Sequence, residues 1–201
     1  MGTVYLNGEN VDFQGPAPAT PLEVWSVLEN HLSQSGMLIE RMEVDGADWV
    51  PGSDEPTVSY GTIHIHSVSQ SSKATQIVDE LRKSRESLEG SWLDAAREVL
   101  RSPWDRFQPR ALELLDATQP LIQSVSVLVA FGQESESNWG QELQQASHSL
   151  NEGVERLIDA FEARDSVSFS DAAGMECLDG VRAVFGALDA AASELRKGAI
   201  Q

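Results

Sequence analysis

Apolar and polar side chains alternate along most of the first 70 residues, which is the pattern of strands that bury one face. Val4 and Leu6 lie on one side of the first such run. Asn7-Gly8 follows it and is a hairpin-turn signal, because both residues tolerate a positive φ. We therefore expect an N-terminal hairpin whose return strand continues the alternation over residues 11–13.

A helix and three further strands complete the predicted sheet domain. Apolar side chains recur at helical spacing over 21–34, and alternating runs predict strands at 38–44, 47–50 and 57–67. Hairpin, helix, strand, short strand and strand is the element order of the β-grasp, or ubiquitin-like, fold. The N-terminal third therefore resembles that fold in topology and length, although no family-specific motif accompanies the resemblance. The expected domain covers residues 1–70.

From Lys73 onward the apolar spacing changes to three and four residues, the period of an amphipathic helix. Short polar breaks divide this region into four predicted helices, over 73–99, 102–131, 138–161 and 170–195. Helices joined by short loops favour a mostly antiparallel four-helix bundle, here over residues 73–201. The expected fold class is thus α+β, with Ser-Gln-Ser-Ser at 69–72 as the linker between two domains. The residues on the two cleanest seams, all expected to be buried, are Leu157, Phe161, Phe185 and Leu188.

The net charge of the chain limits which classes of partner it is expected to bind. The 201 residues include 32 acidic and 14 basic ones, for a net charge of -18. Nucleic acid and anionic membranes should be repelled, whereas a basic protein surface should be attracted. The most apolar run, 121–131, is shorter than the roughly 18 residues of a membrane span and predicts a buried helix without membrane insertion. No signal-peptide pattern opens the chain and Cys177 is its single cysteine, so we expect a cytoplasmic protein.

Few side chains are spaced as a catalytic or metal site requires. His64 and His66 would share one face of a strand, a spacing that occurs in metal sites, but the sequence supplies no obvious third ligand. Two polar residues on an open sheet face are more typical of a surface in contact with water. Cys177 lies between Glu176 and Asp179, whose charges would raise the thiol pKa and disfavour a nucleophilic role. We therefore expect no cofactor and no catalytic residue.

Trp49 is the candidate partner-binding residue, because it follows a polar turn and precedes Pro51, where an indole would be exposed. The sequence thus predicts a non-catalytic adaptor or assembly factor that binds a basic protein and is compatible with self-association. An acidic secretion- or flagellum-type chaperone is an alternative that rests on bulk properties alone. A metal-dependent enzyme, with a site that the sequence does not reveal, is a second alternative.

Overall fold

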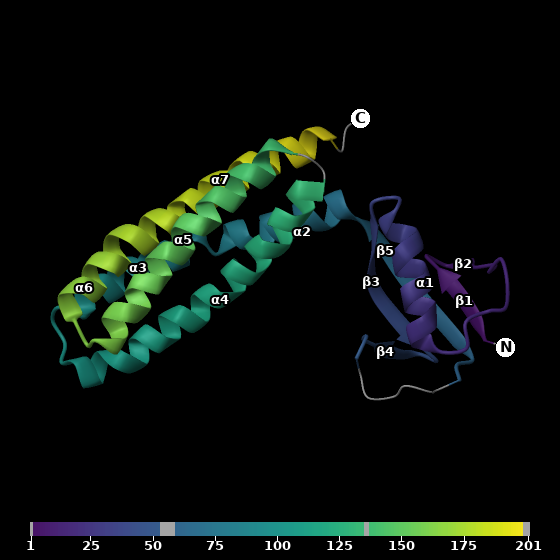
Figure 1. Ribbon diagram of the computed structural model, residues 1–201, viewed down its shortest axis with the longest axis horizontal. Coiled ribbons are helices and arrows are strands. Elements are labelled where there is room, and N and C mark those ends of the chain that lie inside the picture. The colour runs from purple at the N-terminus through teal and green to yellow at the C-terminus, as the bar shows by residue number, and fades with distance from the viewer. Residues whose placement is uncertain (1, 53–58, 135–136, 199–201) are drawn as a thin grey trace. The chain divides into compact units, whose positions relative to one another are not determined.

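The protein is an α+β protein whose chain divides into two compact units. The structure, a computed structural model, describes residues 2–52, 59–134 and 137–198. The unit Met1–Lys73 contains the sheet, and the unit Ala74–Gln201 is helical (Figure 1). The predicted α+β class is therefore confirmed.

The sheet unit is built on a five-stranded mixed sheet with the order β2-β1-β5-β3-β4. β1 runs parallel to β5, and the remaining neighbours are antiparallel. The strands are β1 (Thr3–Leu6), β2 (Glu9–Asn10), β3 (Met37–Val44), β4 (Ala47–Trp49) and β5 (Thr62–Ser69). Because β1 and β5 are adjacent in the sheet, the first and last strands of the unit bring residues about 60 positions apart in the sequence into register.

One helix, α1 (Pro21–Ser33), covers one face of this sheet (Figure 1). It begins where the Thr20 hydroxyl accepts a hydrogen bond from the Glu23 amide at 3.3 Å, and Pro21 occupies the first turn. The buried apolar side chains of the unit come from the helix, from the facing side of the strands and, in one case, from the segment just before β5. They are Val4, Val24, Leu28, Leu32, Met42, Tyr60, Ile63 and Ile65.

Two predicted strands differ from the structure in extent. The return strand of the hairpin is the two-residue β2, and Val11 and Phe13 follow it as partly buried residues outside the sheet. The last strand begins at Thr62, later than predicted, and continues to Ser69. Residues 53–58, which include the predicted start of that strand, lie outside the described residues.

The predicted serine-rich linker is instead regular structure, so this expectation was wrong. β5 ends at Ser69, and α2 (Gln70–Lys83) begins at the next residue. The Ser69 hydroxyl accepts a hydrogen bond from the amide of Ser72 at 3.1 Å, as an N-cap does. Serine here starts a helix, and the boundary between the two units falls inside α2, after Lys73.

The helical unit contains the rest of α2 and a succession of longer helices. These are α3 (Arg85–Glu98), α4 (Trp104–Glu134), α5 (Asn138–Glu162), α6 (Ser166–Asp171), the π-helical segment η1 (Ala172–Cys177) and α7 (Leu178–Gly198). The predicted helix over 73–99 is therefore divided at Ser84, whose hydroxyl donates to the carbonyl of Leu81 at 2.7 Å. Pro109 and Pro120 are both exposed, and α4 continues through both of them.

The core of the helical unit lies between α5 and its neighbours α4, η1 and α7 (Figure 1). Leu157, Phe185 and Leu188 are fully buried there, as predicted. Phe161 is only half-buried, because it lies at the margin of α5 with its ring 5.5 Å from that of Trp104. The expectation that all four seam residues are enclosed is therefore wrong for Phe161.

Helix α4 contains the apolar run 121–131 and extends well beyond it toward the N-terminus, as the predicted helix over 102–131 does. By length and composition only, Trp104–Gln133 would be able to cross a membrane, a property that core helices of soluble proteins share. The helix buries residues at three- and four-residue spacing against the helical core, among them Phe107, Leu114, Leu121 and Leu128. Its opposite face is exposed to solvent and includes charged side chains such as that of Glu113.

The π-helical segment follows from the spacing of buried side chains along the last helix. Phe169, Ala173, Cys177, Val181 and Phe185 recur at every fourth residue, and each is at most 1% exposed. In a regular α-helix, such a series would drift around the axis by about 40° at each step. A π-helical stretch has more residues per turn, so it keeps the series on the buried side. η1 spans the middle of this series.

Candidate functional site

The structure places His64 and His66 on β5, on the sheet face opposite the apolar core, and both are exposed. The Tyr5 ring stacks on that of His64, with 4.9 Å between centroids and 10° between planes. Arg41 pairs with His66 across the strands, and Glu43 pairs with His64. Among the residues that the structure describes, no group of three or more His, Cys, Asp or Glu side chains is placed to hold a metal ion. The two histidines are thus a two-ligand candidate on an open polar face.

Trp49 lies at the end of β4, opposite Met42, within the short strand predicted over 47–50. Its indole is half-buried and packs against Trp25 of α1, with 6.0 Å between ring centroids. The side chain therefore covers the margin of the sheet core. Its predicted contact with a partner would use only the part of the ring that remains exposed.

Cys177 is fully buried in η1. Burial raises the pKa of its thiol to about 12, and the charge of Glu176 acts in the same direction. The thiol is therefore protonated near neutral pH, and a protonated thiol is a weak nucleophile. Cys177 instead belongs to a close helix contact, since a Cβ added to Gly153 of α5 would lie 3.1 Å from the backbone nitrogen of Cys177.

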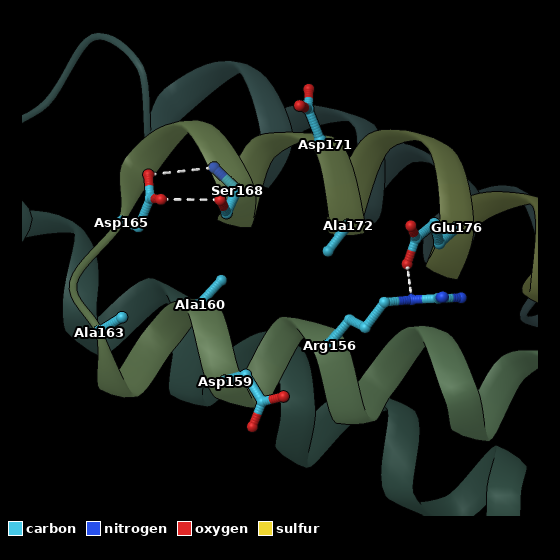
Figure 2. A pocket seen from close by; sticks show the side chains of 9 residues that line it. All are labelled: Arg156, Asp159, Ala160, Ala163, Asp165, Ser168, Asp171, Ala172 and Glu176. Atoms are coloured by element: carbon cyan, nitrogen blue, oxygen red, sulfur yellow. Dashed lines mark hydrogen bonds and ion pairs between the residues drawn. The ribbon is translucent and has the colours of Figure 1, made fainter.

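The groove with the most distinctive chemistry lies between α5 and the α6–η1 segment, and we call it the α5–η1 groove (Figure 2). Its volume is about 450 Å³. Three alanine side chains line its apolar part: Ala160 of α5, Ala163 at the C-cap of that helix, and Ala172 of η1. The polar residues that line it are Arg156, Asp159, Asp165, Ser168, Asp171 and Glu176.

Two of the four acidic residues in this groove are engaged in local structure. Asp165 is the N-cap of α6 and accepts hydrogen bonds from the amides of Val167 and Ser168. The Ser168 hydroxyl also donates to it at 2.7 Å, and this hydrogen bond is the main reason that the pKa of Asp165 is lowered. Glu176 forms an ion pair with Arg156 across the groove (Figure 2).

The other two acidic residues are not engaged. Asp159 and Asp171 are exposed, and within the described part of the chain their carboxylates have no ion-pair or hydrogen-bond partner. Figure 2 shows Asp159 on the α5 side of the groove and Asp171 on the opposite side. The groove therefore combines an apolar floor with a net negative rim that has two free carboxylates.

In a second polar cluster, on α2, α3 and α7, every named charged side chain is paired within the cluster. Asp189 accepts hydrogen bonds from Arg82 at 2.7 Å and from Arg85 at 3.2 Å. Glu89 accepts from Arg85 at 2.8 Å and lies 3.4 Å from Arg182, and the hydrogen bond from Arg85 is the main reason that its pKa is lowered. The pairs that involve Asp189 or Arg182 connect α7 with α2 and α3, which are far from it in the sequence. We therefore interpret the cluster as a set of ion pairs that stabilises the packing of α7 against α2 and α3.

Sequence reasoning did not identify the α5–η1 groove. Its residues come from two segments, 156–163 and 165–176, within a stretch that contains 11 acidic and two basic residues between Glu134 and Asp179. Such an excess is typical of a solvated helix surface. The local excess of acidic residues could have pointed to this region. Only the packing of α5 against η1 shows which carboxylates share a groove.

No protein-family model, no curated protein sequence and no solved structure matches this chain.

Proposed function

We propose that the protein is a non-catalytic adaptor or assembly factor that binds a basic protein surface. The proposal rests on two facts about the charged side chains: acidic residues are in excess, and most basic residues are already paired. Acidic residues outnumber basic ones by 32 to 14. Eleven of the 14 basic side chains already lie within ion-pair distance of a carboxylate of the same chain. The field outside the molecule is therefore negative and attracts a cationic partner before contact.

The fold is compatible with this role. We propose that the sheet unit is a β-grasp module; the strand order β2-β1-β5-β3-β4, the parallel pair β1 and β5, and the single helix over one face support the assignment. We likewise propose that the helical unit is a four-helix bundle whose consecutive long helices run in opposite directions, which the short connections between them support (Figure 1). Two separate cores would let an adaptor present two surfaces.

The proposal is tested by identifying a partner and then measuring its association. The full-length chain is cross-linked in extracts of its native host, and the captured protein is purified and recombined with it. We expect a stoichiometric complex with a basic protein. Its association rate should fall steeply between about 0.01 M and about 0.1 M salt, because screening shortens the Debye length from about 30 Å to about 10 Å. A partner that is not basic, or a rate that does not depend on salt, would contradict the proposal.

Trp49→Ala tests the predicted contact in the sheet unit. If the exposed part of the indole contacts the partner, the substitution should raise the dissociation rate and leave the salt dependence unchanged. Trp25→Ala is the matched control, because it removes the other ring of the same pair and perturbs the same part of the sheet core. Equal losses for the two variants would mean that Trp49 acts only through the stability of the sheet unit.

A further inference from the structure

We infer that the α5–η1 groove is the docking site for an amphipathic, lysine- or arginine-bearing helix of the basic partner. This inference rests on the proposed function and adds the surface and the chemistry of the bound segment. The groove is independent of Trp49, because all the residues that line it belong to the helical unit.

The charges of the groove are arranged to receive a cation. Asp165 is used by the cap of α6, and Glu176 by Arg156. Asp159 and Asp171 remain available at the two outer edges of the groove, where Figure 2 shows their carboxylates pointing away from each other, so a basic side chain that crosses the groove to either edge would gain a carboxylate without breaking an existing ion pair. The alanine floor would contact the methylene stem of that side chain, since Lys and Arg bury their stems on apolar surfaces.

An apolar ridge beside the groove indicates that the bound segment is amphipathic. Val167, Asp171 and Met175 follow one another at four-residue spacing along α6 and η1. Val167 is 62% exposed and Met175 is 64% exposed, which are among the largest exposures of apolar side chains in the described residues. A helix that carried leucine next to its basic residues would cover both side chains while its cations face Asp159 and Asp171.

Charge complementarity also selects this occupant over others. A second copy of the chain carries the same net charge of -18 and would be repelled. An anionic membrane would be repelled for the same reason. The groove therefore fits a cationic protein segment better than either.

The test uses the full-length chain and a short, dye-labelled amphipathic peptide with leucine along one helical face and lysine beside it. Binding is followed by fluorescence anisotropy. Asp159→Asn/Asp171→Asn should weaken binding by between about threefold and about tenfold, as expected for the loss of two exposed ion pairs. Asp116→Asn/Glu142→Gln changes the net charge equally at exposed sites on α4 and α5 outside the groove, and should weaken binding by less than about twofold.

A third variant tests the apolar ridge. Val167→Ser/Met175→Ser should weaken binding without changing its salt dependence, because it removes apolar contacts and leaves the charges in place. Circular dichroism and thermal unfolding of every variant check that the fold is retained. Retained affinity in this variant would overturn the predicted orientation of the peptide on the ridge.

The remaining outcomes separate the groove from the proposed function. If the groove pair and the control pair weaken binding equally, the groove assignment is overturned and charge-driven binding of a basic partner survives. If the wild-type chain binds a peptide with glutamate at every lysine position as tightly as the lysine peptide, both proposals are overturned. If sedimentation shows that the wild-type chain self-associates and the groove pair does not, the occupant is a second copy, and the proposed peptide partner is wrong.

Discussion

Short polar side chains determine where several elements of this protein begin. The Thr20 hydroxyl caps α1, the Ser69 hydroxyl caps α2, and the Asp165 carboxylate caps α6. Each accepts a hydrogen bond from a backbone amide that would otherwise have no partner within the first turn. In the sheet unit, the carboxylate of Asp45 similarly accepts from the amides of Gly61 and Thr62 at the start of β5.

Glycines decide how closely the long helices approach one another. A Cβ added to Gly180 of α7 would lie 2.7 Å from the Cα of Leu150 in α5, and one added to Gly132 of α4 would collide with the Cα of Gly140. Both contacts involve backbone, which cannot move aside as a flexible side chain could. The helices therefore depend on the absence of a side chain at these positions.

Gly180→Ala should lower the free energy of unfolding by about 1–3 kcal/mol, because the new methyl group forces α5 and α7 apart. Gly186→Ala is the control in the same helix: nothing lies within 4 Å of its added Cβ, so better helix propensity should raise stability by up to about 1 kcal/mol. Denaturant unfolding of both variants measures the difference. Equal effects at the two positions would show that α5 and α7 are not in close contact at Gly180.

At the scale of elements, the last helix combines α6, η1 and α7 without an interruption in the chain. A π-helical segment corresponds to one residue more than an α-helix needs over the same turn. Here the extra residue allows buried side chains to recur every four positions from Phe169 to Phe185. The same segment contributes Ala172 and Glu176 to the α5–η1 groove.

Deletion of Met175, the exposed residue of η1, should convert the π-helical segment to α-helix and retain a folded helical unit. Deletion of Ala183, an exposed residue of α7, should instead cost several kcal/mol, because it rotates every later buried side chain by about 100°. Thermal unfolding followed by circular dichroism compares the two deletions. Comparable losses would mean that η1 is required for the packing of the helix.

At the scale of the whole molecule, acidity is a property of both units. Residues 1–73 include ten acidic and two basic residues, and residues 74–201 include 22 and 12. The helical unit offsets more of its charge through ion pairs between helices, such as Arg82 with Asp189 and Arg196 with Asp79. Each unit also has its own cluster of buried apolar side chains.

Separate cores predict that the sheet unit folds alone. A fragment of residues 1–73 should give dispersed amide signals in an NMR spectrum, because its buried cluster lies entirely within those residues. The fragment retains the Ser69 cap and the ion pair between Lys73 and Glu40, which measures 3.0 Å. A spectrum of an unfolded chain would show that the helical unit is needed to complete the sheet core.

Hydrophobic periodicity alone was sufficient to determine the α+β class of the protein. Side chains alternate around Val4 and recur every three or four residues around Leu157. These spacings show which side of a strand or helix faces the core, and they depend only on residues that are close in the sequence. Net charge is likewise independent of the fold, so the expectation of a basic partner, which experiment has still to test, follows from the sequence alone.

The tertiary structure decided what depends on neighbours distant in the chain. Ser69–Ser72 has the composition of a linker, yet a hydroxyl placed next to a free amide starts a helix there. Trp49 follows a polar turn, yet Trp25 is positioned to cover part of its ring. Asp159 and Asp171 belong to one groove because α5 packs against η1, and Gly153 permits that approach. Spacing along the chain carries no information about which helix faces which, because that choice depends on how all the side chains fit together at once.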